Sequence, residues 1–373
     1  MQDTAAIDRR FMAMALGLGA RGLGQVWPNP AVGCVIVKGG RVLGRGWTQP
    51  GGRPHAETEA LAQAGDAARG ATAYVTLEPC AHHGKTPPCA EALAEAGVAR
   101  VVSALTDPDP RVAGQGHARL AAAGVALTAG VMEAEARRGN EGFLSRINRG
   151  RPHLTLKLAT SLDGRIATAT GESQWITGPE ARRAVHAMRA SHDAVLVGAG
   201  TARADDPSLT VRGLGIDRQP VRIVASRRID LPTESRLFTR IEEAPVWICH
   251  GPDADAQRHA AWAGRGARLI DVSPNGGRQI DPLSLLQALG AAGLTRVFCE
   301  GGGALAASLL NAGLVDELVT FTAGIGLGAE GQPGLGAMGL DRLAEAPRFA
   351  LDRLDRIGPD VLARWRPAER ATT

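Results

Sequence analysis

The stretch from His55 to Cys89 constrains the fold more than any other part of the chain, because ligands suited to one metal ion are spread along it. It begins with His55-Ala-Glu57 and also contains Cys80 and Cys89. Zinc prefers imidazole and thiolate ligands, and a carboxylate two residues after the histidine can act on an activated water without being a ligand. The stretch therefore predicts a hydrolytic zinc site with His55, Cys80 and Cys89 as ligands and Glu57 as the proton carrier.

The spacing of the two cysteines departs from the usual zinc-deaminase signature, which separates them by about two residues. Eight residues, 81–88, lie between Cys80 and Cys89. We expect Cys80 at the end of a strand, Cys89 at the beginning of a helix, and a loop that bulges out between them. Unpaired N–H groups at a helix N-terminus favour thiolate, which suits a metal ligand.

Apolar spacing predicts alternating strands and helices along the first part of the chain. Such alternation is typical of an α/β sheet with helices on both faces. The expected helices cover residues 7–18, 55–64, 89–96, 116–123 and 133–147, and the expected strands cover 31–37, 42–47, 73–77, 101–105 and 125–129. Turn-forming residues at 148–152 then predict a boundary between a domain of residues 1–148 and a domain of residues 149–373.

The second domain is expected to alternate in the same way. Strands are predicted at residues 155–158, 194–197, 221–225, 246–249, 268–270, 296–299 and 318–322, and helices at 179–190, 282–292 and 303–312. Glu300-Gly-Gly-Gly-Ala-Leu-Ala306 follows a strand and begins a helix, so its backbone N–H groups are suited to a phosphate. The acidic pair Asp316-Glu317 precedes the next strand, which argues against a Rossmann dehydrogenase and favours a dihydrofolate-reductase-like sheet.

Composition argues against nucleic-acid and membrane proteins. The net charge is only +4 over 373 residues, and aromatic residues make up 3%, which leaves few side chains for base stacking. No apolar run is long enough to cross a bilayer, and the N-terminus lacks the layout of a signal peptide. Five cysteines, three of them in or beside strand-like runs, are expected to be free thiols. We therefore expect a cytoplasmic protein.

The first domain resembles the deaminase half of the bifunctional riboflavin-biosynthesis deaminase-reductases. The segments that carry the resemblance are Pro28-Asn-Pro-Ala-Val-Gly33, His55-Ala-Glu57 and Pro79-Cys-Ala-His-His-Gly-Lys-Thr-Pro-Pro-Cys89, including the long loop between the cysteines. The resemblance implies a cytidine-deaminase-like three-layer fold and a small phosphorylated pyrimidine substrate, 2,5-diamino-6-(5-phosphoribosylamino)pyrimidin-4(3H)-one. It also implies contacts from Asn29 to the nucleotide and from Lys85 to its phosphate.

Residues after 149 resemble the reductase half of the same family. The resemblance implies NADPH-dependent reduction of the ribosyl group of 5-amino-6-(5-phosphoribosylamino)uracil to ribityl. The implied cofactor-binding residues are Ala159, Trp175, Thr201, Asp205, Glu300, Gly301, Gly302, Gly303, Ala304, Leu305 and Ala306. The implied substrate-binding residues are Lys157, which polarises or protonates the sugar, and Ser173, Arg189, Leu209, Arg212 and Glu300, with the two arginines on the 5′-phosphate.

Two other functions fit parts of the sequence. One is a deaminase whose second domain has no catalytic role, and the other is a nucleic-acid deaminase that acts on tRNA, which the basic pI of about 9.0 favours. The scarcity of aromatic residues and of basic clusters speaks against the second alternative. We also expect the protein to form a homo-oligomer.

Overall fold

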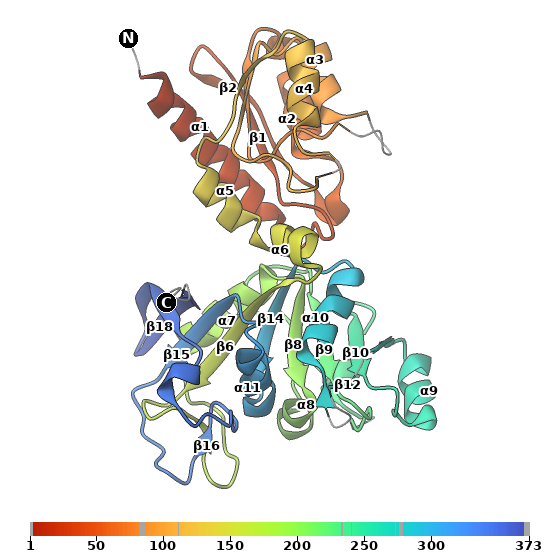
Figure 1. Cartoon of the computed structure of the whole chain (residues 1–373), viewed down its shortest axis with the longest axis vertical. Helices are drawn as coiled ribbons and strands as arrows, with labels where there is room; N and C mark the ends of the chain where they lie inside the picture. Colours follow the sequence, from red (N-terminus) through yellow and green to blue (C-terminus); the bar gives the residue numbers. More distant parts are fainter. Residues whose placement is uncertain are drawn as a thin grey trace. The chain divides into compact units, whose positions relative to one another are not determined.

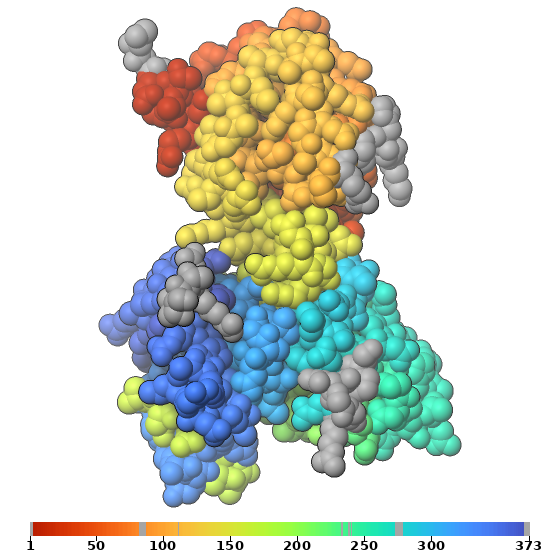
Figure 2. Space-filling view, viewed as in Figure 1, coloured from red at the N-terminus to blue at the C-terminus, as the bar shows by residue number. Residues whose placement is uncertain are grey.

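The chain folds into two compact units, residues Met1–Gly150 and Arg151–Thr373, in a computed structural model (Figure 1). Each unit is closely packed in the space-filling view (Figure 2). The structure describes residues 3–81, 87–110, 112–232, 234–239, 241–272, 274–275 and 279–368.

The first unit is built on a five-stranded sheet with the strand order β2-β1-β3-β4-β5. Strand β1 is antiparallel to both of its neighbours, β2 and β3, and β3, β4 and β5 run parallel to one another. The strands are β1 Gly33–Lys38, β2 Arg41–Trp47, β3 Thr72–Val75, β4 Arg100–Ser103 and β5 Ala126–Thr128. The helices are α1 Thr4–Gly19, η1 Ala20–Gly22, η2 Pro50–Gly52, α2 Ala56–Ala64, η3 Gly65–Ala68, α3 Cys89–Glu95, α4 Gln115–Ala122, α5 Glu133–Gly139 and α6 Glu141–Arg149. Figure 1 shows α1 and α5 on one side of the sheet and α2, α3 and α4 on the other, which is the expected three-layer arrangement.

Small residues let α2 lie unusually close to the sheet. A Cβ atom on Gly44 of β2 would come within 2.0 Å of the carbonyl oxygen of Ala60, and one on Gly46 would come within 2.3 Å of that of Ala56. The facing side of α2 presents fully buried alanines such as Ala56 and Ala60. This close packing fixes the N-terminus of α2, where His55 and Glu57 lie.

Two expectations for the first unit are wrong. The helix expected over residues 133–147 is two helices, because Asn140 leaves the helical path between α5 and α6 and its side chain accepts a hydrogen bond from the N–H of Ala31 at 3.1 Å. Cys80 does not end a strand, since β3 ends at Val75. The last backbone hydrogen bond before Cys80 runs from the N–H of Glu78 to the carbonyl of Leu105, which follows β4. The next residue, Pro79, has no N–H group to continue the ladder.

The second unit contains a nine-stranded sheet with the order β11-β10-β9-β8-β14-β6-β15-β18-β17, parallel except for the pairs that involve β18. Its main strands are β6 His153–Thr160, β8 Ala194–Gly198, β9 Val221–Ala225, β10 Val246–His250, β11 Arg268–Asp271, β14 Arg296–Gly301, β15 Glu317–Thr322, β17 Phe349–Ile357 and β18 Asp360–Pro367. Two small pairs are β7 Arg165–Ala167 with β16 Gln332–Pro333, and β12 Pro274–Asn275 with β13 Gln279–Ile280. The helices are α7 Pro179–Ala190, α8 Ala199–Asp205, η4 Arg236–Phe238, α9 Ala256–Gly264, α10 Pro282–Ala291, α11 Gly303–Asn311 and η5 Leu343–Glu345.

Every strand and helix expected in the second unit is present, but several elements were not expected. The hairpin of β17 and β18 carries charged residues on both faces of β17, which hides the alternation that usually reveals a strand. Helices α8 and α9 are short and weakly apolar. The hairpin adds two antiparallel strands to the edge of the sheet beside β15.

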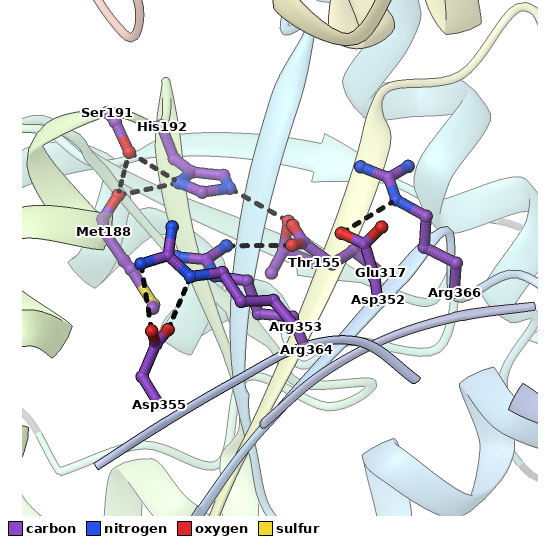
Figure 3. A network of polar contacts seen from close by, with 10 residues as sticks. All are labelled: Thr155, Met188, Ser191, His192, Glu317, Asp352, Arg353, Asp355, Arg364 and Arg366. Atoms are coloured by element: carbon purple, nitrogen blue, oxygen red, sulfur yellow. Dashed lines mark hydrogen bonds and ion pairs between the residues drawn. The ribbon is translucent and has the colours of Figure 1, made fainter. Parts of the chain in front are cut away.

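A buried polar network joins β6, β15 and β18 in the second unit (Figure 3). The hydroxyl of Thr155 lies 3.0 Å from Nε2 of His192 and 3.3 Å from a carboxylate oxygen of Glu317, which in turn accepts a hydrogen bond from Arg364 at 2.8 Å. Burial lowers the pKa of His192 to about 3, so the imidazole is neutral in the folded protein.

Cysteine pairing and membrane crossing are two further points that the structure addresses. All five cysteines are free, and Cys34, Cys249 and Cys299 are buried, as expected. Within the described part of the chain, no helix combines the length and the apolar character needed to cross a bilayer.

Candidate active sites

Three ligand side chains from separate segments converge in the first unit. Nδ1 of His55 lies 3.3 Å from Sγ of Cys89 and 3.6 Å from Sγ of Cys80, and the three ligand atoms are all within 4.8 Å of one another. Two ligands on a tetrahedral zinc ion, at about 2.0 Å for nitrogen and about 2.3 Å for sulfur, are separated by roughly 3.5 Å. The donor set and its spacing therefore fit zinc.

Local structure explains why the three ligands point to one place. His55 is the N-cap residue of α2, with extended backbone, and Cys89 is the first residue of α3. The N–H of Cys89 donates a hydrogen bond to Sγ of Cys80 at 3.4 Å. Hydrogen bonding with Cys89 also lowers the pKa of the Cys80 thiol to about 4. The pKa of the Cys89 thiol, at the start of α3, is raised by its hydrogen bond with Cys80 and by burial. Thiolate is therefore favoured at Cys80 and not, as expected, at the first residue of the helix.

Glu57 lies in the first turn of α2, beside the ligand cluster, and is only 4% exposed. Burial raises the pKa of Glu57 to about 6, because its effect is larger than that of the nearby His55, which acts to lower the pKa. A carboxyl group with a pKa close to neutrality can both accept and return a proton.

The cluster opens into a cavity of about 400 Å³. His55, Glu57 and Cys80 line the cavity, and so does Asn29, whose side chain is held by a hydrogen bond to the carbonyl of Val26 at 3.3 Å. Sequence reasoning placed Lys85 here as well, but it lies outside the described residues. The cavity also has polar lining residues that sequence reasoning missed, namely Arg53, Thr48, Glu78, Asp107, Asp109 and Arg146. Of these, only Arg53 and Glu78 stood next to a motif in the sequence.

A second cluster of charges lies at the ends of parallel strands in the second unit. Arg189 of α7 makes a bidentate ion pair with Glu300, the last acidic residue of β14, and its guanidinium also donates to the carbonyl of Thr210 at 2.8 Å. Burial alone would raise the pKa of Glu300, but Arg189 and Lys157 outweigh it and hold the pKa below its ordinary value. Burial lowers the pKa of Lys157, while the carboxylates of Glu300 and Asp205 oppose that shift.

The glycine-rich loop lies between β14 and α11, next to the end of β8. Gly301 and Gly302 have φ angles of 86° and 91°, and a Cβ on Gly302 would come within 2.6 Å of the hydroxyl of Thr201. No side chain caps the N-terminus of α11, where the loop continues through Gly303, Ala304, Leu305 and Ala306. Uncapped N–H groups behind a close-fitting glycine turn fit the pyrophosphate of a dinucleotide.

The remaining predicted residues of the second unit lie on several different segments. Ala159 lies on β6, Ser173 is partly buried, and Trp175 is 66% exposed with the guanidinium of Arg182 at 4.5 Å from its ring centroid. Leu209 is buried in the apolar core and adopts a φ of 53°. The contact of Leu209 with substrate stays a prediction.

His186 is a residue of this cluster that sequence reasoning missed. Its Nδ1 accepts a hydrogen bond from the N–H of Arg212 at 3.2 Å, and burial together with Arg189 lowers its pKa. The signal that was present is helical spacing, since His186 and Arg189 are three residues apart on α7 and therefore share a face.

Comparison with known proteins gives the same division. The profile of the cytidine and deoxycytidylate deaminase zinc-binding region matches residues 5–105, and that of the RibD C-terminal domain matches residues 152–363. The riboflavin biosynthesis protein RibD of Escherichia coli (strain K12) is 44% identical over 95% of this chain and 98% of its own length.

Two solved structures are similar over both units. The structure of RibD from Acinetobacter baumannii is 40% identical, covers 98% of this chain and 100% of its own, and has a TM-score of 0.89. The diaminohydroxyphosphoribosylaminopyrimidine deaminase/5-amino-6-(5-phosphoribosylamino)uracil reductase of Thermotoga maritima is 34% identical, with the same coverage and a TM-score of 0.86. These likenesses extend over both halves and are to bifunctional enzymes, so they favour neither a deaminase with a non-catalytic second domain nor a tRNA deaminase. The chain belongs to the RibD family, the bifunctional deaminase-reductases of riboflavin biosynthesis.

Proposed function

We propose that this chain catalyses two consecutive steps on a small phosphorylated pyrimidine. The first is the zinc-dependent hydrolytic deamination of 2,5-diamino-6-(5-phosphoribosylamino)pyrimidin-4(3H)-one. The second is the NADPH-dependent reduction of the ribosyl group of 5-amino-6-(5-phosphoribosylamino)uracil to ribityl. The observation that carries the proposal is the His55, Cys80 and Cys89 cluster opening into a cavity beside Glu57. We assign the first step to residues 1–148 and the second to residues 149–373.

In the deaminase site, His55, Cys80 and Cys89 would hold zinc, which would supply Lewis-acid activation of a water molecule. Glu57 takes up a proton at its carboxylate and delivers it to the 2-amino nitrogen, which leaves as ammonia. The raised pKa of Glu57, about 6, supports both transfers. Asn29 contacts the nucleotide in the cavity, and Lys85 binds its phosphate.

In the reductase site, the loop Glu300–Ala306, together with Ala159, Trp175, Thr201 and Asp205, would hold NADPH, which would supply hydride to C1′ of the sugar. Lys157 gives a proton to the sugar oxygen as the ribose ring opens. The lowered pKa of Lys157 and its electrostatic interactions with the carboxylates of Glu300 and Asp205 support that role. Ser173, Leu209, Arg189, Arg212 and Glu300 face the substrate.

Two further assignments belong to the proposal. The five free thiols favour a reducing compartment, so we place the protein in the cytoplasm.

We also infer a homo-oligomer, because the edge strand β17 exposes Leu351 and Leu354, at 50% and 60%. Light scattering of the purified chain and of a Leu354→Arg variant tests the second point, with a smaller mass expected for the variant and equal masses contradicting it.

Supplying the deaminated intermediate directly tests the reductase half. The purified chain is expected to oxidise NADPH when given 5-amino-6-(5-phosphoribosylamino)uracil, whether or not zinc has been removed by a chelator. A folded sample that leaves NADPH unoxidised under these conditions contradicts the reductase assignment. If NADPH oxidation persists after zinc removal, the reduction does not depend on the zinc-binding deaminase site.

A further inference from the structure

Glu78 is a buried carboxylate in the wall of the deaminase cavity that the proposed chemistry does not use. It precedes Pro79 and the zinc ligand Cys80, and it is 4% exposed. Its two oxygen atoms accept four hydrogen bonds, all from backbone N–H groups. Oε2 accepts from Asp107 at 3.0 Å and Gly114 at 2.9 Å, and Oε1 accepts from Gly116 at 2.8 Å and His117 at 3.2 Å.

Two of these donors, Asp107 and Gly114, belong to a segment that contributes to the lining of the cavity, and the other two, Gly116 and His117, lie in the first turn of α4. We call residues 107–110 and 112–114 the wall segment, because Asp107, Asp109 and Val112 line the cavity. The wall segment runs into α4, whose N-cap residue is Gly114 and has no side chain to satisfy the first N–H groups. Glu78 takes the place of the missing cap, and its negative charge is favourable at a helix N-terminus.

Backbone contacts join the same two segments. The N–H of Glu78 donates to the carbonyl of Leu105 at 2.8 Å, just before the wall segment begins. A Cβ atom on Gly116 would lie 1.9 Å from the carbonyl oxygen of Pro79, so α4 begins in direct contact with the residue that precedes Cys80. The wall segment and the zinc ligands are therefore fixed to one another through Glu78 and Pro79.

The surroundings of Glu78 exclude a second hydrolytic centre. Oγ of Ser103 lies 2.9 Å from Nε2 of His117, and Nδ1 of His117 lies 4.0 Å from Glu78, an order that resembles a serine hydrolase. Ser103 is completely buried, however, so no substrate reaches its hydroxyl. These contacts instead join Ser103 of β4 and His117 of α4 to Glu78, which lies two residues before the zinc ligand Cys80.

We propose that Glu78 is a positioning residue of the deaminase: it holds the wall segment at a fixed distance from the zinc ligands and thereby sets the affinity for the pyrimidine substrate. The inference rests on the deaminase activity proposed above. Glu78 does not touch the reacting atoms, so its loss acts on substrate binding while the chemical step and the metal remain.

Glu78→Gln tests this role with little change in size. A glutamine oxygen accepts two of the four bonds, but its amide nitrogen is a donor that faces two further donors. The wall segment is then no longer held. We expect KM for the diaminopyrimidine to rise about tenfold or more, with kcat within about twofold of wild type. Zinc content and NADPH oxidation on the deaminated intermediate are expected to match wild type.

Glu91→Gln is the matched control, because Glu91 of α3 forms an ion pair with Arg119 of the same helix α4 and the substitution makes the same change of carboxylate to amide. It is expected to leave KM unchanged. Gly116→Ala is the second variant, since its methyl group would lie 1.9 Å from the carbonyl oxygen of Pro79 and 3.2 Å from Cγ of Glu78. It is expected to separate α4 from both residues and to raise KM as Glu78→Gln does.

The outcomes separate this inference from the proposed function. A wild-type chain that releases no ammonia overturns the deaminase itself. An active wild type with an unchanged KM in both variants overturns the positioning role. Loss of zinc in both variants, or a fall in kcat at constant KM, also overturns it, because Glu78 then acts on the metal or on the chemical step.

Discussion

At the scale of single residues, Glu57 is expected to act in deamination and not in reduction. Glu57→Gln keeps the size of the side chain but cannot carry a proton. Because general acid–base catalysis contributes about 10²- to 10⁴-fold, we expect deamination to fall by at least about a hundredfold. Ammonia release, zinc content and NADPH oxidation on the deaminated intermediate are the measurements, and the last two are expected to stay at wild-type values. A variant that deaminates at near wild-type rate contradicts the proton-carrier role.

Arg189 is a residue of the second unit whose substitution is expected to affect the reductase alone. Arg189→Lys cannot reproduce the bidentate pair with Glu300 and leaves a buried carboxylate poorly compensated. Because lysine keeps the charge but loses the two-pronged geometry that fixes Glu300 in the site, we expect reductase kcat/KM to fall by roughly tenfold or more while deamination is unchanged. Arg342→Lys is the control, since Arg342 pairs with Glu345 at the surface. Equal reductase activity in the two variants contradicts the role of the pair.

His192 predicts how the second unit responds to acid. Its folded pKa of about 3 lies below the unfolded value of about 6.5, so protonation favours the unfolded state. The stability that the neutral ring contributes is complete above about pH 6.5 and is lost as the pH falls toward about 3. Between neutral pH and about pH 5 the loss is about 2 kcal/mol.

His192→Gln keeps hydrogen-bonding groups in the network but does not titrate. The measurement is urea unfolding at neutral pH and at about pH 5, monitored through hydrogen exchange of the β6 amides. Between these two pH values, the variant is expected to lose less unfolding free energy than wild type. The same pH dependence in both proteins excludes His192 as the cause.

At the scale of elements, the packing of α2 on β2 controls the zinc site. Gly46→Val places side-chain atoms where the carbonyl of Ala56 now lies, at 2.3 Å from the first added carbon. We expect α2 to be displaced, zinc content and deamination to fall together, and the reductase to remain active. Gly17→Ala is the control, because a Cβ atom there meets nothing within 4 Å. Full zinc content in Gly46→Val contradicts the account of α2.

Local pattern predicted most elements, and its failures have physical causes. Helical spacing indicated α1, α7 and α11, and the motif residues indicated where α2 and α3 begin. The break at Asn140 was missed because it depends on a hydrogen bond to Ala31, which is remote in sequence. The strand expected to end at Cys80 is shorter because Pro79 cannot continue the ladder. Strand β17 was missed because its side chains are mostly exposed on both faces.

At the scale of the whole molecule, each unit contains its own site, and the two sites were predictable to different extents. The zinc ligands and Glu57 were found from residue type and spacing, and the structure brings them together. The pairing of Arg189 with Glu300 and the position of His186 were not, because they depend on contacts between residues 111 and 26 positions apart in the sequence. The wall segment was missed for a similar reason, since only the four hydrogen bonds to Glu78 place it at the cavity.

The central claim is that one chain performs deamination and then reduction. Its most direct test is a single assay in which the full chain receives the diaminopyrimidine substrate and NADPH, with ammonia release and NADPH oxidation followed together. We predict that ammonia appears first and that NADPH oxidation follows in equal amount, whereas Glu57→Gln releases almost no ammonia and oxidises NADPH only when the deaminated intermediate is added. Ammonia release without NADPH oxidation, or NADPH oxidation by Glu57→Gln on the diaminopyrimidine, would contradict the account.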